Sequence, residues 1–265
     1  TPACTDIGAL FYSKVVERVV PVSSARVAET VKLLENTFRS VNIALVNEMA
    51  LMCERMGIDV WEVIEAAATK PFGFMPFYPG PGIGGHCIPL DPAYLSWKAK
   101  SYGFHTKFIE LATDINGNMP RHVVSKVAEA LNLEGKALRG SRVLILGMAY
   151  KKDVNDVRES PSLELYKLLM HYGASVEYHD PHVESFKDGD HEYHSVTISR
   201  SSLAAYDCVI LSTNHSDLDY EMIADSARLI VDTRNAFKSC ASTKIIRIGA
   251  PTPSVSAWTG AHIAG

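Results

Sequence analysis

The most constraining feature of this chain is a stretch from Ser23 to Met56 that contains neither proline nor glycine. Apolar side chains recur along it at spacings of three and four, which predicts one continuous α-helix. Ser23 or Ser24 is suited to cap its start, and Gly57 to end it. Such a helix would be roughly 50 Å long at 1.5 Å per residue, which is too long for one small core. Helices of this length usually link domains or lie in a dimer interface.

The segments around this stretch divide the chain into a helical part and an α/β part. Further helical patterns follow at 57–70, 91–103 and 105–132. A short helical piece and an extended segment, VVERVVPVSS, precede Ser23 and resemble the end of something larger. From Arg139 onward, short apolar strands alternate with helical patterns, as in a doubly wound parallel sheet. Ligands bind such sheets at the carboxyl ends of the strands, predicted here at Gly147–Tyr150, His179–Asp180, Thr213–His215 and Asp232–Asn235.

Composition excludes several classes of protein. The chain has 265 residues, of which 47% are hydrophobic and 21% charged, as in a globular protein. The net charge is −4 and basic residues are scattered, so nucleic acid is not an expected partner. We find neither an apolar run of about 20 residues nor a signal peptide, so no membrane association is expected. The five cysteines are odd in number and widely spaced, which favours reduced thiols in a cytoplasmic protein; Cys53 and Cys208 fall in core patterns.

A second feature is the segment PGPGIGGHCIPLDP, residues 79–92, which places four prolines and four glycines around Cys87. Glycine and proline interrupt helices and strands, so this segment is predicted to be a loop of fixed shape. A thiol near the centre of such a loop suits a nucleophile, although an ordinary loop cysteine would give the same pattern. A metal site at His86 and Cys87 would lack further spaced ligands, so we expect none.

Four segments together resemble the UDP-glucose/GDP-mannose dehydrogenase family, and most closely its UDP-N-acetylglucosamine 6-dehydrogenase branch. They are AETVKLLENTFRSVNIALVNE, KPFGFMPFYPGPGIGGHCIPLDP, LGMAYKKDVNDVRESP and VDTRN. The resemblance implies an α/β protein with a central all-helical dimerisation domain, containing one very long helix, and a Rossmann-like parallel-sheet UDP-binding domain. The expected divisions are 1–22, a remnant of an N-terminal NAD-binding domain, then 23–135, 136–250 and a tail at 251–265. A GxGxxG fingerprint for NAD does not follow any predicted strand.

The family resemblance also implies a reaction. Its members use two NAD⁺ to oxidise C6 of a nucleotide sugar from the alcohol to the acid. A thiolate adds to the aldehyde, hydride loss gives a thioester, and water hydrolyses it, so that covalent catalysis divides a difficult step. On the resemblance, Cys87 is that nucleophile. Lys32 and Asn36, four residues apart on one helix face, match a catalytic lysine and asparagine. Asp91 matches an aspartate that positions water, although an N-cap of the helix starting at Pro92 is an alternative.

The remaining matched residues concern binding. On the resemblance, Lys151 contacts the UDP-sugar and Arg234 lies on the substrate side, where cations meet pyrophosphate. Arg158 matches an arginine that reaches NAD. Gly84 allows close approach of the backbone, and Tyr78 is a candidate substrate contact whose role could equally be packing.

The resemblance therefore implies a homodimeric, NAD-dependent oxidation of a UDP-sugar, with UDP-N-acetylglucosamine as the favoured substrate. UDP-glucose and UDP-N-acetylmannosamine enzymes share most of this chemistry and stay open as alternatives. So does a non-catalytic module that binds a UDP-sugar or dimerises, although the combination of Cys87, Lys32, Asn36 and Asp91 favours an enzyme. A chain without the cofactor domain is expected to be inactive alone.

Overall fold

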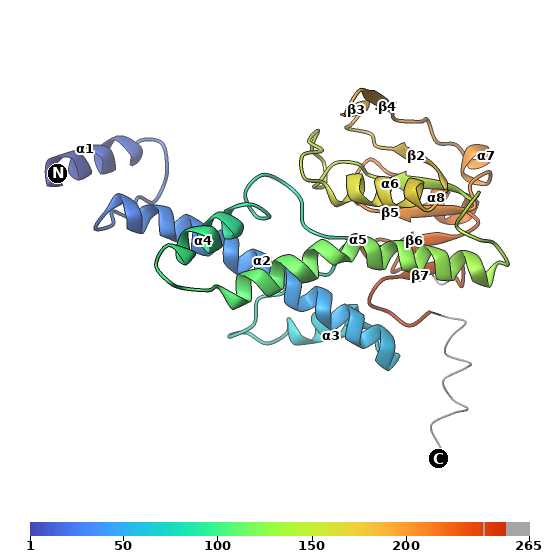
Figure 1. Cartoon of the computed structure of the whole chain (residues 1–265), viewed down its shortest axis with the longest axis horizontal. Coiled ribbons are helices and arrows are strands. Elements are labelled where there is room, and N and C mark those ends of the chain that lie inside the picture. The colour runs from blue at the N-terminus through green and yellow to red at the C-terminus, as the bar shows by residue number, and fades with distance from the viewer. Residues whose placement is uncertain (241, 253–265) are drawn as a thin grey trace, which may run out of the picture.

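The structure of the chain, a computed structural model, describes residues 1–240 and 242–252, so the predicted tail lies almost entirely outside the described residues. A helical part and an α/β part lie along the long axis of the molecule (Figure 1). The helices are α1 (Pro2–Tyr12), α2 (Ala25–Met56), α3 (Val60–Ala67), α4 (Asp91–Lys100), α5 (Lys107–Leu133), α6 (Pro161–His171), α7 (Arg200–Leu203) and α8 (Tyr220–Ser226). Each of these helices is too short or too polar to cross a bilayer.

Helix α2 confirms the prediction of one very long helix. It runs for 32 residues, the Ser24 side chain accepts a hydrogen bond from the N–H of Val27, and Gly57 ends it in the left-handed region with φ 71°. The buried face of α2 includes polar residues, Asn36 and Asn47 among them. Cys53 is also buried there, as predicted. Helix α2 therefore packs against the rest of the molecule through buried amide side chains as well as through apolar ones.

The segment before α2 differs from the prediction. Helix α1 forms, has no buried residue, and lies apart from the rest of the chain in Figure 1. The expected strand at VVERVVPVSS does not form; residues 15–24 are irregular, with a turn and bends. The prediction was wrong for a physical reason. A strand needs a neighbour for its N–H and C=O groups, and the described residues offer none to this segment.

The other helices of the central domain cross α2. Helices α4 and α5 both pack against it, and α5 also packs against α6 of the second domain. Helix α5 continues through Pro120. Proline has no N–H, so the carbonyl of Asn116 loses its usual helical donor. That carbonyl lies beside the Gly/Pro loop, 3.4 Å from where a Cβ would stand on Gly82.

The second domain is built on the predicted parallel sheet. Its strands are β1 (Arg142–Leu146), β2 (Ser175–His179), β5 (Cys208–Leu211), β6 (Ile230–Asp232) and β7 (Ile245–Arg247), in the order β2-β1-β5-β6-β7. All neighbouring pairs are parallel. The order reverses at β1, which places a ligand crevice at the carboxyl ends of β1 and β5. There Gly147 has φ 85°, and a Cβ on it would stand 2.6 Å from the Cβ of Thr213.

The sequence analysis did not predict a hairpin, which forms from β3 (Ser185–Asp188) and β4 (His191–His194). Its turn contains Gly189 with φ 58°. An Asp-Gly pair is a strong hairpin signal, but the flanking residues are too polar to stand out as strands.

A clasp ties the chain after β7 back to the central domain. The indole N–H of Trp61, on α3, donates to the carbonyl of Ile248 at 2.8 Å. The N–H of Gly249 donates to Oε1 of Glu54, on α2, at 2.6 Å. Burial disfavours the charged form of Glu54, but hydrogen bonds from His122 and Gly249 outweigh it and hold its pKa below the usual value. The two domains are thus joined through buried polar contacts as well as through sequence.

Candidate active site

The Gly/Pro loop at 79–92 runs from α3 to α4 across the carboxyl edge of the sheet. Its N–H at Gly85 donates to the carbonyl of Arg158 at 3.2 Å. At Gly84, an added Cβ would stand 2.7 Å from Cβ of Tyr150 and 2.8 Å from the carbonyl oxygen of Glu159. The loop backbone therefore lies directly on the segment that follows β1, and glycine is needed for that approach.

The structure brings three of the predicted catalytic residues together. Cys87 is exposed, and its carbonyl accepts a hydrogen bond from the N–H of Asp91 at 2.8 Å. The carboxylate of Asp91 accepts from Nδ2 of Asn36 at 2.6 Å. Helix α4 begins at Asp91 itself and its N-cap is Leu90. The N-cap role considered for Asp91 is therefore wrong, and its carboxylate serves Asn36 on α2.

Lys32 lies one turn before Asn36 on the same helix but points elsewhere. Its ammonium pairs with Glu35 at 3.1 Å, and both side chains are more than half exposed. The hydrogen bond and charge of Lys32 lower the pKa of Glu35. Rotation of the long lysine side chain would be required to bring the ammonium to Asp91. An exposed pair of this kind holds the lysine only weakly, because water screens the attraction between the two charges.

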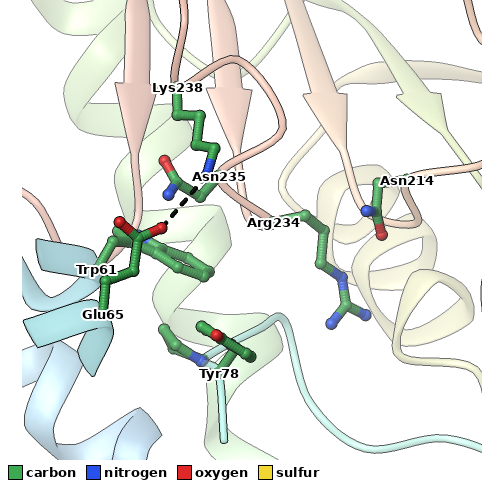
Figure 2. A pocket seen from close by; sticks show the side chains of 8 residues that line it. Trp61, Glu65, Tyr78, Asn214, Arg234, Asn235 and Lys238 are labelled. Carbon is green, nitrogen blue, oxygen red and sulfur yellow. Dashed lines mark hydrogen bonds and ion pairs between the residues drawn. The ribbon is translucent and has the colours of Figure 1, made fainter. Parts of the chain in front are cut away.

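Two adjoining cavities lie beside the loop. One, of about 350 Å³, is lined by Trp61, Glu65, Tyr78, Pro79, Asn214, Arg234, Asn235 and Lys238 (Figure 2). The other, of about 200 Å³, is lined by Ile43, Tyr78, Gly80, Gly82, Ile83, Gly84, Ile88, Tyr150, Lys151 and Arg234. Tyr78 and Arg234 line both. Ile88, which lines the smaller cavity, is the residue after Cys87 in the loop.

The larger cavity is lined by aromatic and polar side chains. The rings of Trp61 and Tyr78 stack, with centroids 6.1 Å apart and an interplanar angle of 14°. Beside Trp61 and one turn along α3, Glu65 pairs with Lys238 at 3.3 Å. Figure 2 shows Arg234 extending from the segment after β6 toward the segment that carries Tyr78. A flat group with polar edges would fit between such walls.

Arg234 is the most unusual charge in the structure. Its Nε donates to the carbonyl of Ser212 at 2.8 Å, and its backbone N–H donates to the carboxylate of Asp232. Burial lowers the pKa of Arg234 to about 10, so the guanidinium stays charged at neutral pH. Within residues 1–240 and 242–252, the guanidinium forms no ion pair with a carboxylate. A Cβ on Gly80 would stand 2.6 Å from its Nη1, so the loop covers it closely. A half-buried cation of this kind, lining two cavities, is suited to an anionic ligand.

The remaining predicted residues lie around these cavities. Lys151 is exposed at the mouth of the smaller one. Arg158 forms a bidentate pair with Asp156, at 2.9 and 2.7 Å, and this pairing lowers the pKa of Asp156 to about 2. The guanidinium of Arg158, which the family resemblance assigns to NAD, is therefore already paired with the carboxylate of Asp156.

A buried carboxylate fixes the carboxyl ends of β1, β2 and β5. Asp180 accepts from the N–H groups of Met148 and Ala149 at 2.7 and 2.8 Å, and its Oδ2 lies 3.1 Å from Nε2 of His215. Burial raises its pKa, but the hydrogen bonds from His215 and Ala149 outweigh burial, so the net shift is downward. Three of the predicted strand ends are thus held by one side chain, which gives the segment leading to Lys151 a defined path.

Several residues at the site were not predicted from sequence: Trp61, Tyr150, Asn214, Lys238, Asn47 and Asn116. Tyr150 and Asn214 fall within the predicted strand ends, so that signal was available. Trp61, Asn47 and Asn116 sit in helical patterns, where position alone does not separate packing from function.

Comparison with known proteins relates both domains of the chain to one family. Residues 26–118 match the central domain of the UDP-glucose/GDP-mannose dehydrogenase family, and residues 144–239 match the UDP-binding domain of that family. The chain is 42% identical over 195 residues to UDP-N-acetyl-D-glucosamine 6-dehydrogenase of Pseudomonas aeruginosa, covering 74% of this chain and 46% of that protein. It is 36% identical over 232 residues to UDP-N-acetyl-D-mannosamine dehydrogenase of Methanococcus maripaludis strain C7, covering 84% and 51%.

Solved structures show the same architecture. The UDP-D-ManNAc dehydrogenase of Pyrococcus horikoshii superposes with a TM-score of 0.82 at 31% identity, over 93% of this chain and 57% of that one. The chain spans about half the length of the curated relatives it matches. Two matched domains in the family order, a shared fold and the loop that carries Cys87 lead to one conclusion: the chain belongs to the UDP-glucose/GDP-mannose dehydrogenase family.

Proposed function

We propose that this chain is the substrate-binding and dimerising part of an NAD-dependent UDP-sugar 6-dehydrogenase whose substrate is UDP-N-acetylglucosamine. The observation that carries the proposal is Arg234, a half-buried guanidinium that lines two adjoining cavities, the smaller of which is also lined by Ile88, the residue after Cys87. A non-catalytic binding module would have no use for a thiol, a carboxylate and an amide held close together.

The cavities suggest how the substrate lies. The uracil ring would occupy the larger cavity, beside the stacked Trp61 and Tyr78. The pyrophosphate would meet Arg234, with Lys151 at the mouth of the next cavity. The sugar would then lie in the smaller cavity with C6 toward Cys87. This order places each charge of the ligand against a cation and each flat or apolar part against the matching wall.

The chemistry that this chain supplies is covalent. The thiolate sulfur of Cys87 bonds to C6 of the aldehyde, and the carbonyl oxygen takes a proton to give a thiohemiacetal. In the last step a water oxygen attacks the thioester, the C–S bond breaks, and the sulfur leaves as the thiolate. Asn36 and Asp91 would orient that water, and Lys32 would stabilise the oxyanion once its side chain turns from Glu35.

NAD would accept the hydride at each oxidation, but the described residues do not form a site for it. A glycine-rich turn of the dinucleotide-binding type does not follow β1 or the other described strands, and Arg158 is held by Asp156. We therefore define the complete enzyme as this chain together with the NAD-binding domain that the family resemblance implies. This chain alone is expected to produce no NADH from any UDP-sugar. We also propose the cytoplasm as its location, where unpaired thiols such as Cys87 stay reduced.

Calorimetric titration of this chain with UDP-N-acetylglucosamine, UDP-glucose and UDP tests the substrate assignment. We expect binding of all three, with the N-acetyl sugar tightest, because the smaller cavity is lined by Ile43, Ile83 and Ile88 and can take an acetamido methyl group. Equal affinities for the two sugars would keep the UDP site and reject the choice of sugar. An absence of heat with every ligand would contradict the placement of UDP at Arg234.

We propose that a second copy of the chain covers the exposed apolar face of the central domain. Val31 and Leu34 on α2 are 56% and 65% exposed, and Trp97 on α4 is 71% exposed. Exposed apolar surface of this extent usually marks an interface. Light scattering at micromolar protein is expected to give twice the mass of one chain. Leu34→Glu should give a monomer, while Met170→Glu, an exposed position on α6, should stay dimeric. A monomeric wild-type chain would contradict the proposal.

A further inference from the structure

Two buried asparagines on one face of α2 hold the two ends of the Gly/Pro loop. Asn36 donates to the carboxylate of Asp91 at the end of the loop, at 2.6 Å. Asn47 accepts from the N–H of Gly80 at its beginning, at 3.0 Å. The asparagines are eleven residues apart, about three helical turns, so both face the loop from the same side. Cys87 lies between the two points at which the loop is held.

Asn47 makes the more demanding contact of the two. Its side chain is completely buried, with 0% exposed. Pro79 and Pro81 flank Gly80 and have no N–H, so Gly80 supplies the one backbone donor of this stretch of the loop. A buried donor left without an acceptor is strongly disfavoured, so the bond favours a single position of Gly80.

A second amide fixes the orientation of the first. Nδ2 of Asn47 donates to Oδ1 of Asn116 at 2.9 Å. Nδ2 of Asn116 donates in turn to the carbonyl of Ser40 at 3.0 Å. This relay begins and ends on α2 and passes through α5, so the Oδ1 of Asn47 can point only at the loop. The carbonyl of Asn116, which Pro120 releases from the helix, lies against the same loop at Gly82.

The position of Gly80 matters because the loop covers Arg234 there. A Cβ on Gly80 would stand 2.6 Å from Nη1 of Arg234. The guanidinium itself is held from the other side, through the carbonyl of Ser212. The contact between Asn47 and Gly80 therefore sets where the loop begins relative to a cation that is fixed independently of it.

We propose that Asn47 is a positioning residue that, together with Asn36, sets the distance between the thiol of Cys87 and the anion site at Arg234. The inference rests on the proposed function, because it assigns Asn47 a part in presenting Cys87 to a ligand bound at Arg234. Loss of the bond would leave Arg234 able to bind the nucleotide but would let the loop shift. A displacement of about 1 Å at a reacting atom can cost about 10²-fold in rate.

The experiment compares Asn47→Ala with Asn118→Ala, an exposed asparagine of α5 whose amide bonds only within its own helix among the described residues. In the complete enzyme, we expect Asn47→Ala to lower kcat for acid formation about 10–100-fold while the KM and the UDP affinity change less than threefold. Asn47→Asp keeps an acceptor for Gly80, so its kcat should lie between that of Asn47→Ala and that of the wild type. Asn118→Ala should match the wild type in both constants.

Hydrogen exchange of this chain without ligand provides a second test, which does not depend on enzyme activity. The peptide that contains Gly80 to Asp91 should exchange at least about tenfold faster in Asn47→Ala and at the wild-type rate in Asn118→Ala. Unchanged exchange, unchanged kcat, or equal losses of kcat and UDP affinity would each overturn the inference. An inactive wild-type enzyme would reject the proposed function instead, and the exchange rates would still decide whether Asn47 holds the loop. Asn47→Asp serves in both arms if Asn47→Ala does not fold.

Discussion

Cys87→Ser in the complete enzyme is expected to stop the formation of the uronic acid, by at least roughly 10³-fold. A serine hydroxyl is a far weaker nucleophile than a cysteine thiol at neutral pH, so the aldehyde is not captured. The first oxidation does not need the thiol. The variant should therefore release an aldehyde and about one NADH for each sugar, where the wild type gives two. Mass spectrometry of the nucleotide sugars and absorbance of NADH measure both quantities.

The matched control is Cys4→Ser. Cys4 is also exposed, but it lies on α1, which has no buried residue. Both substitutions fall at exposed positions, so neither should change stability by more than about 0.5 kcal/mol. A normal yield of uronate from Cys87→Ser would remove Cys87 from the mechanism, whereas loss of activity in Cys4→Ser would show that the assay reports general thiol damage.

Arg234→Ala is expected to weaken binding of the UDP-sugar about 100-fold, as seen by calorimetry with this chain. Hydrogen bonds to charged groups contribute roughly 1.5–3 kcal/mol each, and the pyrophosphate would lose such bonds. Arg234→Lys keeps the charge but loses the planar fork and the bond to Ser212, so an intermediate loss of about tenfold is expected. Arg142→Ala, which removes an exposed arginine at the opposite edge of the sheet, should leave the affinity unchanged.

The same substitution carries a prediction about stability. Burial lowers the pKa of Arg234, which means that the folded protein disfavours its charge. Removal of that charge should therefore leave the unfolding temperature of the ligand-free chain unchanged or raise it. A variant that loses both affinity and stability would show that Arg234 holds the fold together, and would argue against its assignment to the substrate.

Sequence patterns predicted the fold where a single strong signal was present. The absence of proline and glycine between Ser24 and Gly57 defined α2, and short apolar runs defined the strands of the parallel sheet. The strand predicted before Ser23 was wrong because apolar composition cannot supply a neighbouring strand. The hairpin at Ser185–His194 was missed because its strands are polar.

The candidate site was predictable in part. Cys87 could be singled out because the glycines and prolines around it predict a loop of fixed shape. Lys151 and Arg234 could be placed near a site because they lie at or just after predicted strand ends. Asn47 gave no signal, since a polar residue in a helical pattern is usually on the surface. Its role depends on a partner 33 residues away and on a second amide 69 residues away. Contacts of that kind arise from tertiary packing, which local periodicity does not encode.

The clasp after β7 also sets an order of assembly. Trp61 and Ile248 are 187 residues apart in the chain, and Glu54 and Gly249 are 195 apart. Closing loops of that length costs entropy before any contact forms, so such pairs come together late. During synthesis, α2 and α3 emerge long before β7 exists. The helices can form early, but Trp61, which lines the larger cavity, can pack against the second domain only after residue 249 has been synthesised. The larger cavity, which we propose for the nucleotide, is thus among the last parts of the molecule to form, and a chain that stalls earlier has its long helix without this cavity.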